Sequence, residues 1–231
     1  MESVAIAERD GIMVLSADRP PVNAMDVGLL EELVGAIGQL AKQPPPALVL
    51  AGRPGFFSAG ADLKAVPGYG PDEQRRMVDG INQMAIGVYG LPCPVVCAIT
   101  GHAIAGGFVL AVCGDHRIAS TEGKYGLTEV KVGVPYPQGA IGVVRAELSA
   151  AAARALVLGN RLVDAAECVR LGAFDEAVAP DAVVYRALEV AHELAALPAE
   201  LYAQTKNELR GATLADLRAA AEADPLLASW V

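Results

Sequence analysis

Two apolar segments of this sequence each run directly into a turn rich in glycine and alanine. "ALVLAG" leads into "AGRPGFFSAGADLK" (51–64), and "VVCAIT" leads into "ITGHAIAGGFVLA" (99–111). Short apolar runs bounded by turn residues predict buried strands. Small residues in the turns leave backbone N–H groups open to close approach by a ligand. The chain must therefore fold so that two buried strands each end at accessible backbone.

The second of these turns also begins a predicted helix, with Gly106 near its N-terminus. Aligned peptide dipoles favour negative charge at that position. Two backbone donors that converge on one oxygen stabilise an enolate or a tetrahedral oxyanion by a few kcal/mol each. Neither segment fits the phosphate loop G-x-x-x-x-G-K-[ST] or the dinucleotide motif G-x-G-x-x-G. Phe56 stands where a G-x-S-x-G nucleophile elbow needs glycine. For either segment alone, glycines that serve only tight turns remain the alternative.

Strands and helices alternate along most of the chain, which is typical of an α/β fold. Predicted strands cover 4–8, 12–17, the two apolar segments, "HRIAS" (116–120) and 176–179; predicted helices cover 26–42, 72–89 and the segment ending near 113. The remainder after Gln138 is predicted to be mostly helical. We expect a core over residues 1–197 and a C-terminal helical extension of the same domain over residues 198–231.

The composition limits the partners of the chain. A net charge of −9 and a pI near 4.8 argue against nucleic acid. No apolar stretch approaches the ~20 residues of a membrane span, and the first residues do not form a secretory signal, so we expect a cytoplasmic protein. The four cysteines lack metal-ligand spacing, which predicts buried thiols and no metal site. The high hydrophobic content of 53% favours an oligomer.

Four motifs in order resemble the enoyl-CoA hydratase/isomerase, or crotonase, family. They are "RPPVNAMD" (19–26), "FFSAGADLK" (56–64), "TGHAIAGGFVLAVCGDHRIA" (100–119) and "YGLTEVKVGVPYP" (125–137). The resemblance implies the ClpP/crotonase-like spiral of ββα units with a C-terminal helical trimerisation region. It also implies an acyl-CoA thioester as ligand and homotrimers, or hexamers made of two trimers. No cofactor is implied beyond the coenzyme A that arrives with the substrate.

The same resemblance implies roles for individual residues. The Ala61 and Gly106 N–H groups would form the oxyanion hole, and Glu129 would be an acid/base glutamate. Positions implied to bind the substrate or coenzyme A are Asn23, Ala24, Ala59, Gly60, Asp62, Leu63, Lys64, Ala105 and Val109. Asp62 is also predicted to fix its turn through Asx-type bonds, and Lys64 to pair with a phosphate or to cover apolar surface.

One position departs from the pattern of hydratases in this family, which use two glutamates. Val109 occupies the place of the first, and Glu129 that of the second. The chain is therefore similar to the monofunctional Δ3,Δ2-enoyl-CoA isomerases of fatty-acid oxidation, and weak hydratase activity is expected. An acyl-CoA binder without efficient chemistry and a thioester hydrolase stay as alternatives.

Four further features carry smaller expectations. His102 is expected to orient backbone and His116 to be satisfied by hydrogen bonds in the core. Tyr136 is a candidate for acyl-chain selection. The Gly/Pro-rich segment 65–76 is predicted to be a mobile loop over the acyl end of the site.

Overall fold

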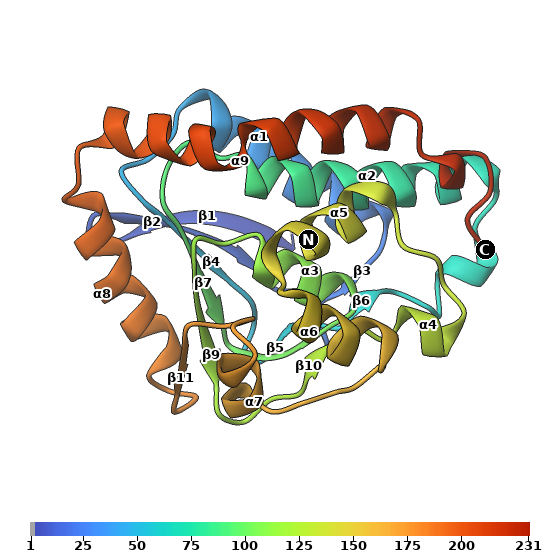
Figure 1. Cartoon of the computed structure of the whole chain (residues 1–231), viewed down its shortest axis with the longest axis horizontal. Coiled ribbons are helices and arrows are strands. Elements are labelled where there is room, and N and C mark those ends of the chain that lie inside the picture. Colours follow the sequence, from blue (N-terminus) through green and yellow to red (C-terminus); the bar gives the residue numbers. More distant parts are fainter. Residues whose placement is uncertain (1–2) are drawn as a thin grey trace.

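The computed structural model describes residues 3–231, and the strands of that part form three sheets (Figure 1). The largest has the order β1-β2-β4-β7-β9-β11; β1 and β2 pair antiparallel, and all other neighbours pair parallel. The smaller sheets have the orders β10-β8-β5 and β3-β6. The strands are β1 (Val4–Arg9), β2 (Ile12–Ala17), β3 (Ala24–Met25), β4 (Leu48–Ala51), β5 (Gly55–Ser58), β6 (Gly60–Ala61), β7 (Val95–Ile99), β8 (Gly101–Ile104), β9 (His116–Ser120), β10 (Tyr125–Gly126) and β11 (Glu176–Val178).

The helices follow the predicted order. They are α1 (Val27–Lys42), α2 (Pro71–Tyr89), α3 (Gly106–Val112), α4 (Glu129–Val132), α5 (Gln138–Glu147), α6 (Ala150–Ala153), α7 (Ala165–Arg170), α8 (Val183–Ala195) and α9 (Ala199–Glu222), with 3-10 turns at Val66–Gly68 and Pro225–Leu227 and a π-helical turn at Arg154–Leu158. Asp26 caps α1 by accepting the Leu29 N–H at 2.8 Å. The predicted start of this helix is confirmed.

The central strands are buried on both faces, which explains why their sequences are continuously apolar. Leu48 and Leu50 of β4 pack into the larger core beside α1 and α2, whereas Val49 packs on the opposite face against α8. Figure 1 shows α8 on the other side of the sheet from α2. The four cysteines are buried and unpaired, as predicted.

Three neighbouring parallel strands repeat one connection. β4 continues into β5, β7 into β8 and β9 into β10, and the second sheet β10-β8-β5 repeats the order of β9, β7 and β4. This repetition is the spiral implied by the resemblance. The carboxyl ends of parallel strands lie at one edge of a sheet. Both glycine turns and the segment that begins at Glu129 therefore start from the same edge.

The glycine turns contain more strand than the sequence predicted. Gly55 of β5 pairs with Gly101 of β8, and a Cβ added at Gly101 would lie 2.1 Å from the Gly55 carbonyl carbon. Because only glycine lets the two backbones approach this closely, the segment forms a strand pair where a simple turn was predicted.

The segment 65–76 is more regular than the mobile loop that was predicted. Val66 is buried in a 3-10 turn, and α2 begins at Pro71. Pro71 suits the first helical position, and Glu73 accepts the Gly70 N–H at 3.0 Å. These contacts order the start of the helix.

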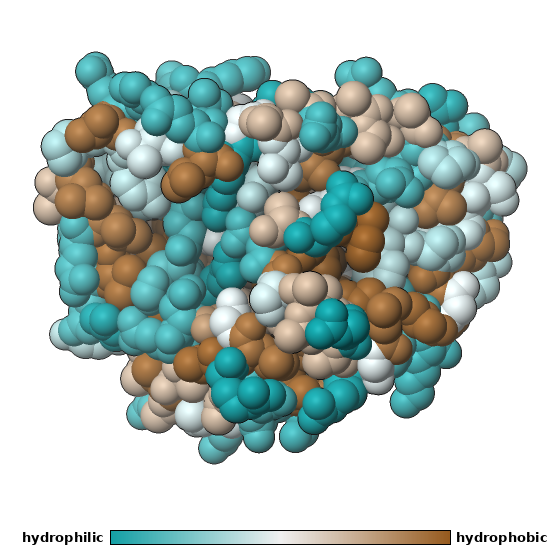
Figure 2. All heavy atoms as spheres, in the orientation of Figure 1, coloured by the Kyte–Doolittle hydropathy of each residue, from teal (hydrophilic) through white to brown (hydrophobic). Residues whose placement is uncertain are grey.

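The last helix covers the molecule along one side. α9 lies beside α2 and α5, and the turn Pro225–Leu227 packs on α2 (Figure 1). Hydrophobic side chains form several separate patches between hydrophilic ones on the face seen in Figure 2. Within residues 3–231, no helix combines the length and the apolar character needed to cross a membrane.

Candidate active site

The first glycine turn presents a backbone N–H of Ala61. Ala61 pairs with Met25 across β6 and β3, and the Asp62 N–H donates to the Met25 carbonyl at 2.8 Å. Successive N–H groups of a strand point to opposite edges. The Ala61 N–H therefore points away from β3. Ser58 stiffens this turn, because its hydroxyl accepts the Gly60 N–H at 3.1 Å.

The second turn presents the Gly106 N–H. Ala105 holds a left-handed φ of 53°, which is strained for a residue with a side chain, and Gly106 begins α3. The Phe108 and Val109 N–H groups donate to the Ala105 carbonyl, at 2.9 and 3.1 Å. Gly106 precedes these two donors in α3. Its N–H is therefore one of the first N–H groups of the helix, which have no intrahelical acceptor.

The two turns touch each other. A Cβ on Gly60 would lie 2.8 Å from the Ala105 Cβ and 2.9 Å from the Gly106 nitrogen, and Gly60 itself has a φ of 79°. Only glycine fits this position. The fold thus brings together the two backbone segments that the sequence singled out.

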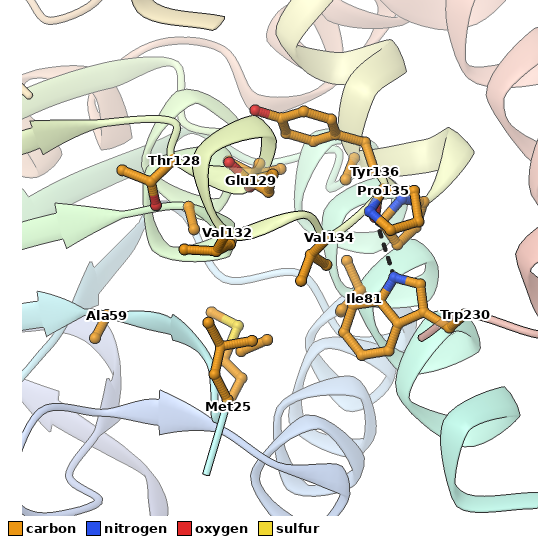
Figure 3. A pocket seen from close by; sticks show the side chains of 17 residues that line it. Met25, Ala59, Ile81, Thr128, Glu129, Val132, Val134, Pro135, Tyr136 and Trp230 are labelled. Carbon is orange, nitrogen blue, oxygen red and sulfur yellow. Dashed lines mark hydrogen bonds between the residues drawn. The ribbon is translucent and has the colours of Figure 1, made fainter. Parts of the chain in front are cut away.

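A small apolar pocket that opens to solvent lies against both turns (Figure 3). The side chains with polar atoms in its wall belong to Thr128, Glu129, Tyr136 and Trp230. The lining residues are Met25, Ala59, Ala61, Leu63, Ile81, Ala105, Gly106, Val109, Thr128, Glu129, Val132, Val134, Pro135, Tyr136, Pro137, Ala140 and Trp230. Glu129 is the one carboxylate among these described residues.

The Glu129 side chain has an unusual environment for a carboxylate. Only 7% of the residue is exposed, and burial raises the pKa of Glu129, although the Tyr136 hydroxyl and nearby backbone N–H groups offset part of this effect. The Tyr136 hydroxyl is near enough to favour the charged form, but not in hydrogen-bonding geometry. Among the described residues, neither Glu129 Oε2 nor the Tyr136 hydroxyl has a hydrogen-bond partner. Such a pair is suited to a group that enters the pocket.

Seven of the twelve predicted catalytic and binding residues line this pocket: Ala59, Ala61, Leu63, Ala105, Gly106, Val109 and Glu129. Tyr136, the candidate for acyl-chain selection, lines it as well. Five others lie outside its lining: Asn23, Ala24, Gly60, Asp62 and Lys64. Ala24 and Gly60 belong to the strand pair that carries the first turn. Lys64 is exposed beside it.

Asn23 has a different role from the ligand contact that was expected. Its side chain is fully buried, accepts the Arg19 N–H at 2.5 Å, and donates to the carbonyls of Ala17 and Phe57 at 2.8 and 3.2 Å. Because these bonds occupy the amide, Asn23 fixes the chain that leads into β3.

Asp62 holds the first turn in place, as the Asx interpretation predicted. Its carboxylate accepts the Lys64 and Ala65 N–H groups at 3.1 and 3.3 Å and the Arg19 guanidinium at 3.0 Å. Burial raises the pKa of Asp62, but these donors outweigh it, so the pKa is lowered. Arg19, which also pairs with Asp26 at 2.8 Å, is committed to this network.

The two histidines of the motifs contact neighbouring groups. His102 Nδ1 accepts the Lys124 N–H at 3.0 Å, and its ring lies 4.7 Å from that of Phe56. His116 Nε2 lies 3.0 Å from Glu176 Oε1. His102 therefore contacts backbone, as expected. His116 is hydrogen-bonded, as expected, but it is partly exposed and does not lie in the core.

Sequence reasoning missed the far wall of the pocket. Ile81 comes from α2 and Trp230 from the segment after α9, so both reach the site only through the packing of distant helices. The single tryptophan of the chain, in a segment with no other signal, was the one feature that could have drawn attention.

A spiral of ββα units whose two glycine turns and one buried glutamate meet at an apolar pocket defines a protein of the crotonase fold. The family model described as enoyl-CoA hydratase/isomerase matches residues 7–229. The chain belongs to this family of enzymes.

Its relatives include proteins named as hydratases and a protein named as an isomerase. A probable enoyl-CoA hydratase of Mycobacterium tuberculosis is 34% identical over 175 residues, which cover 75% of this chain and 67% of that protein. The mitochondrial enoyl-CoA delta isomerase 1 of Mus musculus is 32% identical over 225 residues, 93% of this chain and 75% of that protein. A crystal structure of a probable enoyl-CoA hydratase from M. tuberculosis has a TM-score of 0.89 at 32% identity, and covers 96% of this chain and 94% of its own.

Proposed function

We propose that this enzyme is a Δ3,Δ2-enoyl-CoA isomerase that uses Glu129 as its single proton shuttle. The observation that carries the proposal is the composition of the pocket wall. Glu129 is its one carboxylate among the described residues, and Val109, which is completely buried, occupies the position of the first glutamate of hydratases. A double-bond shift needs one base, whereas hydration is helped by two.

In the proposed reaction, the thioester carbonyl of a 3-enoyl-CoA accepts hydrogen bonds from the Ala61 and Gly106 N–H groups. The contact between their turns supports this placement. Polarisation of the carbonyl acidifies the protons on carbon 2, because the negative charge that forms is delocalised onto the thioester oxygen. Fixed donors of this kind commonly contribute about 3–4 kcal/mol each.

The Glu129 carboxylate then removes one proton from carbon 2 and gives a dienolate. In the dienolate, the C2–H electron pair has formed a C1–C2 double bond and the carbonyl π electrons lie on the thioester oxygen, which the two N–H groups hold. When the oxyanion re-forms the carbonyl, the C1–C2 π pair becomes the C2–C3 double bond, and the C3–C4 π electrons take the proton back from Glu129 at carbon 4. The product is the conjugated 2-enoyl-CoA, and Glu129 is again ionised. Burial supports this role, because it raises the pKa of Glu129 and makes its carboxylate a stronger base.

The apolar wall supports isomerisation over hydration. Addition of water needs a positioned water and groups that exchange its protons, and Val109 offers neither a donor nor an acceptor.

The proposal includes an oligomer and no cofactor beyond the coenzyme A of the substrate. Several large apolar side chains are exposed, among them Leu158, Leu201 and Leu209. Burial of such surfaces between subunits would stabilise a homotrimer, or a hexamer of two trimers.

The test follows trans-3-hexenoyl-CoA by the ultraviolet absorbance of the conjugated product, with crotonyl-CoA as a parallel substrate for hydration. Glu129→Gln should lower the isomerisation rate by about 10²–10⁴-fold. Glu31→Gln, at an exposed surface site, is the matched control and should be unaffected. Fast hydration of crotonyl-CoA, or binding of acyl-CoA without any isomerisation, would contradict the proposal; the second result would favour a carrier.

A further inference from the structure

Trp230 lies at one end of the pocket, and Ala59 and Thr128 lie at the other (Figure 3). The residue is only 5% exposed, although it lies next to the last residue of the chain. Its indole stands beside Ile81 and Val134 (Figure 3). A bulky ring in this position ends the apolar space.

Three hydrogen bonds hold the ring and its backbone. The indole Nε1–H donates to the Pro135 carbonyl at 3.0 Å (dashed in Figure 3), so the ring is tied to the segment that also carries Tyr136. The Trp230 and Val231 N–H groups donate to Gln74 Oε1 on α2, at 3.4 and 3.3 Å. The ring is thus fixed to both sides of the pocket.

A buried polar cluster fixes the start of the same segment. Asp224 accepts the Asn82 amide at 3.0 Å and the Gln138 N–H at 2.8 Å, and Asn82 accepts the Gly139 N–H at 2.7 Å. Asp224 and Asn82 are both almost completely buried. These bonds join the segment to α2 and to the first turn of α5, so Trp230 is held by a rigid support.

The direction of a bound substrate follows from the two ends of the pocket. The thioester would lie at the Ala61 and Gly106 turns, which line the pocket. Figure 3 shows Glu129 between Ala59, which belongs to the first of these turns, and Trp230. The Trp230 end is formed by Ile81, Val134 and prolines, none of which can neutralise a phosphate. The hydrocarbon tail would therefore point toward Trp230, with the phosphates of coenzyme A at the opposite end.

We propose that Trp230 is the specificity-determining residue that restricts the enzyme to short acyl chains. This inference rests on the proposed function for the identity of the ligand as an acyl-CoA. Each methylene that enters an apolar site adds about fourfold to the affinity. The gain continues only while there is space, so it stops where the chain reaches the indole.

The first test uses the unmodified protein and saturated acyl-CoA thioesters with 4, 6, 8, 10 and 12 carbons, which bind without reacting. Affinity should rise by about fourfold per methylene for the short chains and then level or fall. Trp230 is the one tryptophan in the sequence, so its fluorescence reports the end wall alone. Emission should change most at the length where the affinity stops rising. Emission that is independent of chain length would overturn the inference.

The second test compares variants in binding and in isomerisation. In Trp230→Ala, the chain length at which affinity stops rising (the break) should move to longer chains. The ratio of 12-carbon to 4-carbon affinity should rise by at least about tenfold, equivalent to about two further methylenes. Trp230→Phe keeps an aromatic ring and should move the break less. Glu31→Gln, at a side chain that is 57% exposed on α1, is the control and should leave the profile unchanged. An unchanged break in Trp230→Ala would overturn the inference.

The two proposals fail in different ways. A shifted break in the binding profile without isomerisation by any variant would reject the isomerase and keep the role of Trp230. Isomerisation that depends on Glu129, with the same chain-length range in wild type and Trp230→Ala, would support the isomerase and reject the role of Trp230 in chain-length specificity. If Trp230→Ala does not fold, the fluorescence series on the wild type still decides.

Discussion

Two regions of this enzyme bury carboxylates, and they do so in opposite ways. Beside α9, Asp115 lies 2.6 Å from the Lys206 ammonium and 2.9 Å from the Arg210 guanidinium. Glu147 pairs with Arg117 and lies 3.4 Å from Arg210. All five side chains are at most 16% exposed. In the pocket, Glu129 has no cation beside it among residues 3–231, and one of its oxygens has no partner there.

The difference distinguishes a cluster that stabilises the fold from a carboxylate that is available for chemistry. In the ionic cluster each charge is offset by another, and Arg210 also stacks over Tyr89 at 4.1 Å. Burial lowers the pKa of Lys206, and Asp115 opposes this effect. The cluster joins α9 to the β7–β9 region and offers nothing to a ligand. Glu129 pays the cost of burial without an ion pair, which is typical of a group whose partner is a substrate.

The strongest way to break this comparison is to remove one charge from the ionic cluster. Asp115→Ala leaves Lys206 buried without its counter-ion and also removes the acceptor of the Val95 N–H. We expect a loss of about 3–5 kcal/mol in the free energy of unfolding, measured by urea denaturation. The folded fraction should bind acyl-CoA normally.

A matched surface pair provides the control for this prediction. Glu31→Ala removes an ion pair with Arg76 in which both side chains are more than half exposed, and it should leave the unfolding free energy nearly unchanged. If the two variants lost similar stability, the cluster would not be the structural element described above.

Glu129→Gln sharpens the comparison from the opposite side, because it should stabilise the protein. Removing a buried charge without an ionic partner should raise the free energy of unfolding at neutral pH by about 1 kcal/mol, or Tm by about 2–4 °C. Thermal unfolding of both proteins measures this difference.

The pH dependence of that gain follows from the raised pKa of Glu129 in the folded protein. Below the ordinary glutamate pKa of 4.5, the carboxyl is protonated in both the folded and the unfolded state, so its burial buries no charge. As pH rises through 4.5 and then through the folded-state pKa, the unfolded chain ionises first and the wild type loses stability relative to the variant. The gain should therefore vanish in acid. A variant less stable than the wild type at neutral pH would contradict the interpretation.

Much of this fold could be predicted from the sequence, because its signals are local. The cap at Asp26, the apolar runs of β4 and β7, and the two glycine turns depend on neighbours in the chain. Contacts between distant segments could not be predicted in this way. Asn23 looked like a ligand contact until its amide was found bonded to backbone.

The same limit applies within the candidate site. The motifs place Ala61, Gly106 and Glu129 on the chain, and parallel pairing of β4, β7 and β9 then brings their segments to one edge. Trp230 reaches the pocket only because α9 packs on α2 and α5. No spacing along the sequence encodes that packing. The catalytic roles themselves stay predictions for the experiments above.

Tyr136→Phe is the mildest test of the contrast, since it removes only the hydroxyl next to Glu129. That hydroxyl favours the charged carboxylate, so its loss should raise the pKa of Glu129 further. The acidic limb of kcat/KM should move to higher pH, because the base becomes protonated sooner. Above the limb, the rate should change by about twofold, or about 0.5 kcal/mol, because the hydroxyl forms no full hydrogen bond.

A pH–rate profile of wild type and Tyr136→Phe measures the displacement, and Tyr185→Phe, at an exposed tyrosine, is the control. The folded protein should lose no stability, because the buried Tyr136 hydroxyl has no partner among the described residues. If the acidic limb of kcat/KM moved to lower pH in Tyr136→Phe, the Tyr136 hydroxyl would favour the neutral form of Glu129. Glu129 would then be held as a proton donor before substrate binds, and its isolation in the pocket would no longer indicate a base.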